Sequence, residues 1–138
     1  MKKILYLLPV FLILVSCQEE GALTRDREKV LLNPIAELKY SGVFFPTSGI
    51  SVSGEAKIYL ENGQYKVNLE NFSVSNGPDL KVYLSKAATP TDFVNLGNLT
   101  SQTVYPIPSK VDVYAYSHVL IHCQHYNHLF AIAALTSN

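Results

Sequence analysis

All four histidines of this chain lie close together in the sequence, around one of its two cysteines. His118, His122, His125 and His128 surround Cys123 in the stretch SHVLIHCQHYNHLF. Histidine and cysteine are common ligands of zinc and copper, and a cysteine thiolate can also carry redox chemistry. The stretch therefore predicts a metal site, a redox thiol, or a β-strand in which the cysteine packs as a small apolar side chain.

Apolar residues alternate with polar ones from Val113 to Cys123, which predicts a long β-strand with a period of two residues. Cys123 then faces the core together with Val119 and Ile121. The opposite face is expected to be an amphipathic surface that could receive a partner protein or a ring-shaped ligand. Its aromatic and histidine side chains are Tyr114, Tyr116, His118 and His122.

The spacing of these residues limits the metal sites that they could form. His118 and His122 are four residues apart on a strand, about 13 Å, so they cannot share one ion without a bulge between them. A turn after Cys123 would let Cys123, His125 and His128 converge as in a copper site. Such sites usually add an axial methionine, and the single methionine is Met1. No cofactor is therefore evident, copper is the weaker alternative, and the haem-attachment motif Cys-x-x-Cys-His does not occur.

The amino-terminal stretch MKKILYLLPVFLILVSC predicts a secretory signal peptide, with two lysines, an apolar run and small residues before a cysteine. Leu14 to Cys17 resembles a bacterial lipobox, so residues 1–16 are expected to be removed and Cys17 to carry acyl chains such as palmitate. Gln18 after the cysteine favours the outer membrane. These features predict a lipoprotein of the bacterial cell envelope, held on the membrane by its lipid anchor.

Charge and composition limit the partners of the mature protein. Without residues 1–16 the chain has 9 basic residues against 11 acidic ones and no basic stripe, so nucleic acid is not an expected partner. Residues 17–37 begin with a polar, charged stretch and are predicted to be a flexible lipidated tether. Residues 38–138 are predicted to be the folded domain.

From Tyr40 onward, short alternating runs broken by Gly, Pro and Asn predict an all-β fold. Asn62-Gly63 predicts a two-residue hairpin turn, which pairs Leu60 with Tyr65 and Ile58 with Val67. The two prolines of TVYPIP restrict that stretch to an edge strand or a loop, and HLFAIAAL is apolar enough for a central strand. The expected fold is a single antiparallel β-sandwich of roughly seven to nine short strands.

Three stretches of the chain resemble the DM-thirteen domain, a predicted electron-transfer domain. They are the turn and strand Asn76-Gly77-Pro78-Asp79-Leu80, the loop from Leu96 to Leu99 with the following YPIP, and the strand that contains Cys123. The resemblance covers about the last hundred residues. It implies a β-sandwich in which Cys123 occupies the position of the proposed redox cysteine.

Two functions follow from these observations. The first is a membrane-tethered module with a redox or electron-transfer role centred on Cys123 and a redox or envelope protein as its partner. The alternative is a non-catalytic binding or structural envelope lipoprotein in which Cys123 is core packing. A hydrolytic enzyme is disfavoured, because neither Gly-x-Ser-x-Gly nor His-Glu-x-x-His occurs in the sequence.

Overall fold

The computed structural model of this protein describes residues 35–138. The predicted signal peptide (1–16), the predicted lipidation at Cys17 and nearly all of the predicted tether lie outside the described residues. Within residues 35–138, no helix is long and apolar enough to cross a membrane.

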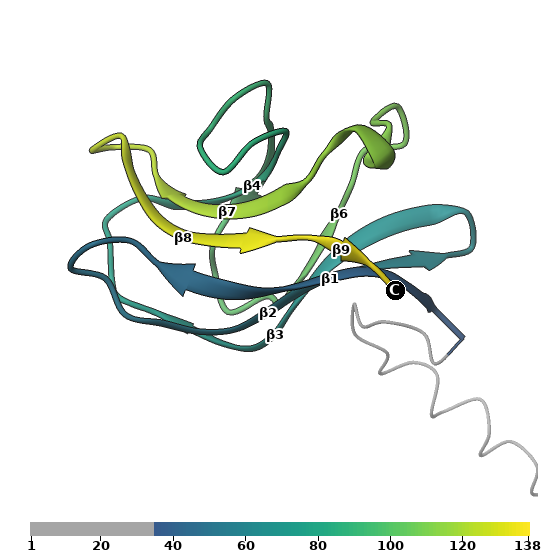
Figure 1. Ribbon diagram of the computed structural model, residues 1–138, viewed down its shortest axis with the longest axis horizontal. Coiled ribbons are helices and arrows are strands. Elements are labelled where there is room, and N and C mark those ends of the chain that lie inside the picture. Colours follow the sequence, from purple (N-terminus) through teal and green to yellow (C-terminus); the bar gives the residue numbers. More distant parts are fainter. Residues whose placement is uncertain (1–34) are drawn as a thin grey trace, which may run out of the picture. The chain divides into compact units, whose positions relative to one another are not determined.

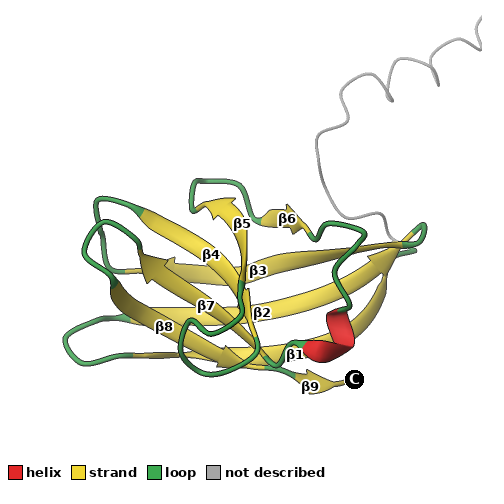
Figure 2. Ribbon diagram, turned by 90° about the horizontal axis from the view of Figure 1, so that it is seen from above, coloured by secondary structure: helices red, strands yellow, loops and turns green. Residues whose placement is uncertain are grey.

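The described chain is all-β, as predicted, and contains nine strands. Its one helical element within residues 35–138 is a single 3₁₀ turn, η2, drawn in red in Figure 2. The strands are β1 (Glu37–Pro46), β2 (Val52–Glu61), β3 (Gln64–Val74), β4 (Leu80–Ser85), β5 (Val94–Asn98), β6 (Val104–Pro106), β7 (His118–Cys123), β8 (His128–Ala134) and β9 (Thr136–Ser137), and η2 is Val113–Ala115.

The strands form one antiparallel sheet in the order β5-β4-β7-β8-β1-β2-β3-β6, with β9 beside β1. Strand β1 joins the two layers, because its first part pairs with β2 while Phe44 to Pro46 pair with β8. The sheet curls so that β4, β7 and β8 lie over β1, β2 and β3 (Figure 1). The predicted sandwich is therefore one continuous sheet that is nearly closed, like a barrel.

The hairpin of β2 and β3 has the predicted register. Leu60 pairs with Tyr65 and Ile58 with Val67. Asn62 and Gly63 form the turn with φ of 51° and 79°, as a turn with two positive-φ residues requires. Ile58 and Val67 are both fully buried, so the alternation of apolar residues and the turn chemistry specify the same pairing.

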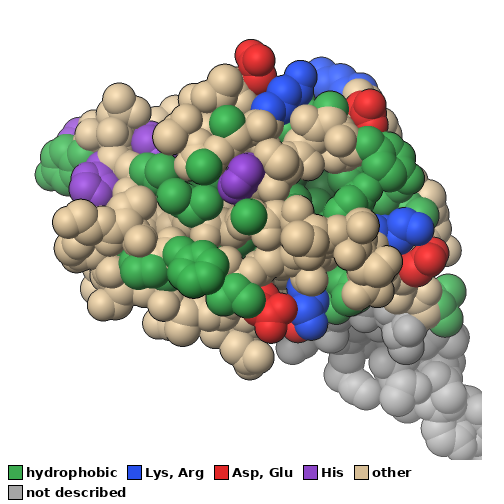
Figure 3. Space-filling model, in the orientation of Figure 1, with side chains coloured by type: hydrophobic (Ala, Val, Ile, Leu, Met, Phe, Trp, Pro, Cys, Tyr) green, Lys and Arg blue, Asp and Glu red, His purple; other side chains and the backbone are tan. Residues whose placement is uncertain are grey.

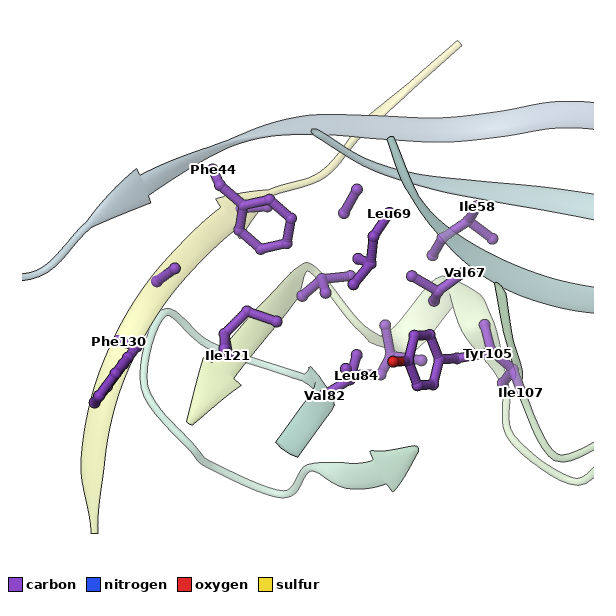
Figure 4. Packing of buried hydrophobic residues seen from close by; sticks show 14 of the residues in the cluster. Phe44, Ile58, Val67, Leu69, Val82, Leu84, Tyr105, Ile107, Ile121 and Phe130 are labelled. Atoms are coloured by element: carbon purple, nitrogen blue, oxygen red, sulfur yellow. The ribbon is translucent and has the colours of Figure 1, made fainter. Parts of the chain in front are cut away.

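Both further strand predictions are confirmed. Strand β6, with its proline, lies at one end of the strand order, and the apolar β8 lies between β7 and β1. Strands without a neighbour on one side tolerate the missing N–H of proline. Figure 4 shows that the core forms where the inner faces of the two layers meet, with contributions from Phe44, Ile58, Val67, Leu69, Val82, Leu84 and Ile121.

A polar cluster lies on the outer face of β2 and β3, on the side of the hairpin that faces away from this core. The carboxylate of Glu70 accepts hydrogen bonds from Tyr59 at 2.9 Å and Asn68 at 3.0 Å, and pairs with the Lys57 ammonium at 3.0 Å. Burial alone would raise the pKa of Glu70, but the hydrogen bonds from Lys57, Tyr59 and Asn68 outweigh it and lower that pKa. The folded state therefore favours the ionised carboxylate.

We expect Glu70→Gln to lower the free energy of unfolding by about 1 kcal/mol at pH 7, because the pair is partly exposed and one hydrogen-bonded charge is lost. The pKa of Glu70 is lower in the folded state than its ordinary value of 4.5. Its contribution is thus complete above pH 4.5 and disappears as the pH falls through the folded pKa. Urea unfolding between pH 2 and 8 measures it, and Glu37→Gln, at a carboxylate 66% exposed, is the control. A difference that stays constant down to pH 2 would contradict this account.

Candidate functional site

Cys123 is the last residue of β7 and faces the core, as the sequence predicts. Its side chain has no exposed surface and belongs to the main apolar cluster. It is the one free cysteine within residues 35–138. Leu80 on β4 and His128 on β8 are its partners in the sheet. In the closed fold, solvent and soluble reagents cannot reach the thiol.

The turn from β7 to β8 carries two of the predicted ligands at the surface. His125 is exposed and its ring packs edge-on against Tyr126 with 4.7 Å between the ring centroids. His128 is also exposed, with its ring 5.1 Å from that of Phe130. Figure 3 shows histidines at this end of the molecule.

The described chain does not gather Cys123, His125 and His128 into a ligand set. No group of three or more His, Cys, Asp or Glu side chains within residues 35–138 is arranged to hold a metal ion. The physical reason is that the strand period turns Cys123 into the core, whereas His125 lies in the exposed turn. The set proposed from the sequence needed all three side chains to meet at one point.

His122 lies on the opposite side of β7 from Cys123, as predicted, but it is not at the surface. Its side chain is only 5% exposed. Tyr83 stacks on its ring at 5.3 Å, and Phe93 stacks on Tyr83 at 4.1 Å. His122 Nε2 lies 3.1 Å from Asn127 Oδ1, while His122 Nδ1 is buried without a hydrogen-bond partner. The outer face of β7 is thus covered by an aromatic stack.

The predicted partner face of Tyr114, Tyr116, His118 and His122 does not form. Strand β7 begins at His118, and Val113 to Ala115 form η2. Asp112 caps this turn by accepting a hydrogen bond from the Tyr114 N–H at 3.1 Å, a local side-chain contact that competes with the strand conformation. The long strand expected from Val113 was therefore wrong in its first half.

These four side chains consequently have different surroundings. Tyr114 is 72% exposed and meets Tyr40, whereas Tyr116 lies beneath the Lys86 ammonium, which is 5.4 Å from the ring centroid. His118 Nδ1 lies 2.7 Å from Ser117 Oγ, and burial lowers the pKa of His118. The four side chains therefore do not share one strand face.

A pocket of about 480 Å³ is lined by residues 74–80 and 98–100, which include Leu80, the first residue of β4. We call it the motif pocket, because its lining includes the whole turn Asn76-Gly77-Pro78-Asp79-Leu80. Leu80 lines the pocket and is also the register partner of Cys123 where β4 pairs with β7. Sequence reasoning identified the motif but not the pocket.

Backbone and side-chain contacts hold the motif pocket in place. The Gln124 N–H donates to the Asp79 carbonyl at 3.0 Å, and the Leu99 N–H donates to the Leu80 carbonyl at 2.8 Å. Lys81 pairs with the Asp79 carboxylate at 3.1 Å and also donates to Asn98. We call this end of the molecule, formed by the motif pocket and the turn 124–127, the thiol end.

Gly77 allows the motif loop to pack closely on the core. A Cβ at this position would lie 2.9 Å from a methyl carbon of Leu80 and 3.1 Å from the tip of the Phe130 ring. Both distances are shorter than ordinary van der Waals contacts. A side chain at position 77 would therefore require the ends of the Leu80 and Phe130 side chains to shift.

Comparison with known proteins agrees with the resemblance inferred from these motifs. The family model described as Electron transfer DM13 matches residues 45–135. No curated protein and no solved structure matches the chain. The matched region contains β2 to β8, the motif pocket and Cys123. Because the match spans more than half of the chain, this protein belongs to the electron transfer DM13 family.

Proposed function

We propose that this protein is a lipid-anchored electron-transfer module of the bacterial cell envelope, with its working surface at the thiol end. The family match over residues 45–135 carries the electron-transfer part. The lysines, apolar run and lipobox-like end of residues 1–17 support the anchor. From Cys17 to Ile35 the extended chain would reach about 60 Å at most, enough to let the domain approach membrane-bound partners.

The thiol end suits contact with a redox partner because several features meet there. The motif pocket is an open, mixed polar and apolar hollow of the size of a small-molecule site. His125 and Tyr126 extend from the neighbouring turn into solvent. Leu80, which lines the pocket, is the partner of Cys123 in the sheet. A redox group bound in the pocket, or presented there by a partner, would contact the strand next to the one that carries Cys123.

The burial of Cys123 restricts the chemistry that its sulfur can perform. A disulfide with a partner thiol releases two electrons and two protons, and it needs a second sulfur in contact with Cys123 Sγ. Oxidation to sulfenic acid needs an oxygen donor such as a peroxide to reach the same atom. Loss of one electron leaves a thiyl radical and a proton, which requires a nearby base.

None of these requirements is met while the thiol end is closed. Cys123 is a free thiol with no exposed surface. We therefore propose that Cys123 enters redox chemistry only when the turn 124–127 and the motif loop separate. Electron transfer in the closed fold would use a group held at the motif pocket.

A redox titration that measures how many electrons the full chain takes up tests this proposal. The chain is purified from its bacterial membranes in detergent. We expect the wild-type chain to be in the membrane fraction and Cys17→Ser to be in the soluble fraction. We also expect reversible uptake of electrons in a redox titration with dithionite and ferricyanide. Retention of this uptake in Cys123→Ala would assign the redox centre to the motif pocket, and its loss would assign it to the thiol.

The alternative is a binding or structural lipoprotein in which Cys123 is core packing. The specific observation in its favour is that a fully buried cysteine within an apolar cluster behaves as a small hydrophobic side chain. A membrane-bound chain that exchanges no electrons, with or without Cys123, would support this alternative and refute the electron-transfer proposal.

A further inference from the structure

A second pocket lies away from the thiol end, where the described chain begins and ends. It has a volume of about 440 Å³ and is lined by the first residues of β1, by η2 and by the end of the chain. Figure 2, seen from above, shows η2, β9 and the carboxyl terminus at the same end of the domain. We call it the tyrosine pocket; its lining residues are Glu37, Leu38, Lys39, Tyr40, Tyr114, Ser137 and Asn138.

The aromatic wall of the tyrosine pocket is held in a defined arrangement. The rings of Tyr40 and Tyr114 meet edge to face, with centroids 6.2 Å apart and an interplanar angle of 76°. A hydrogen bond between the side chains of Tyr65 and Tyr114 raises the pKa of Tyr65 to about 12. Tyr114 is nevertheless 72% exposed. Tyr114 thus contacts Tyr40 and Tyr65, while most of its surface stays open to a ligand.

The polar wall offers hydrogen-bonding groups, and the two charged side chains that line it have opposite signs. The Lys39 ammonium lies 3.4 Å from the Glu37 carboxylate, so the two charges offset each other. Ser137 and Asn138 add an exposed hydroxyl and a side-chain amide. The Asn138 N–H donates to the Lys39 carbonyl at 2.9 Å, which holds the chain end against β1. Such a wall suits an uncharged ligand with many hydroxyl groups rather than a phosphate.

From this combination we infer that the tyrosine pocket binds a short, uncharged oligosaccharide. Sugar rings have apolar C–H faces that pack on exposed aromatic rings, and their hydroxyls hydrogen-bond to carboxylate, ammonium and amide groups at the edge. Tyr114 would provide the stacking surface, and Glu37, Lys39 and Asn138 the hydrogen bonds. The inference does not depend on the electron-transfer role, because the pocket shares no residue with the motif pocket.

Titration of the full chain with chitotriose and with cellotriose, followed by backbone amide NMR shifts, tests this inference. We expect at least one of the two sugars to bind with a dissociation constant of roughly 0.1–1 mM, with shifts at Lys39 and Asn138. Tyr114→Ala should weaken this binding at least tenfold, whereas Tyr114→Phe, which keeps the ring, should weaken it less than threefold.

Tyr126→Ala is the matched control, because Tyr126 is also an exposed tyrosine, at 67%, but lies at the thiol end. Its sugar binding should equal that of the wild type. The amide spectra outside the tyrosine pocket report whether Tyr114→Ala stays folded, and Tyr114→Phe tests the hydroxyl alone. Absence of binding of both sugars by the wild-type chain, or an equal loss in Tyr126→Ala, would overturn the inference.

Discussion

Gly42→Ala is expected to lower the free energy of unfolding by about 3–5 kcal/mol. A Cβ at Gly42 would lie 2.1 Å from the carbonyl oxygen of Ala134 and 2.8 Å from its carbonyl carbon. Both atoms belong to the backbone, so no side-chain rotation can relieve the contact. The strain falls on β1, the strand that joins the two layers of the sheet.

Urea unfolding at pH 7 measures this effect, and Gly49→Ala is the control. Gly49 has a φ of 81° with open space around its Cβ position, so alanine there is expected to cost only about 1–2 kcal/mol for the left-handed conformation. A loss in Gly42→Ala no larger than that in Gly49→Ala would show that β1 and the end of β8 can separate without cost. That result would contradict the pairing of β1 with β8, through which the sheet is continuous.

The second large effect concerns the reactivity of Cys123. In a Cys17→Ser background, we expect the native chain to react with a maleimide roughly 10³-fold more slowly than the urea-unfolded chain. The sulfur has no exposed surface, so the reagent must wait for an opening that costs a large part of the folding free energy. Mass spectrometry of the intact chain follows the reaction.

A neighbouring position supplies the matched control for this measurement. Gln124 follows Cys123 and is exposed, so the variant with Cys123→Ala and Gln124→Cys places its thiol at the surface of the same turn. This variant should react at nearly the same rate in the native and unfolded states. Fast native labelling of Cys123 itself would mean that the thiol end opens readily, and it would support Cys123 as a direct redox centre.

A slow reaction of Cys123 with the maleimide would be consistent with both proposed functions, the electron-transfer module and the binding or structural lipoprotein. Core packing of Cys123 and an electron-transfer role for the protein are compatible if the redox group sits in the motif pocket. They conflict only if the thiol itself must exchange electrons with a partner. Together with the electron counting described above, the labelling rate therefore separates a thiol-centred mechanism from a pocket-centred one.

The sequence alone determined the local features of this fold. The all-β class and the register of the Asn62-Gly63 hairpin follow from turn chemistry and from the period of two along each strand. The prolines restricted β6 to an edge strand or a loop, and the structure has the edge strand. The inward direction of Cys123 follows from the same period. Its place in a family with an electron-transfer role was inferred from short motifs, and the family match agrees with it.

Only the tertiary structure decided what covers each face and which loops meet. The period of a strand assigns His122 to the outer face, but there Tyr83 of β4 stacks on its ring and only 5% of His122 stays exposed. Likewise the cap from Asp112, a single side-chain hydrogen bond, ends the alternation that predicted a long strand from Val113. The motif pocket joins two loops that the sequence keeps far apart. The physical reason is that alternation records side-chain direction within one strand, whereas burial and pockets depend on contacts between distant segments.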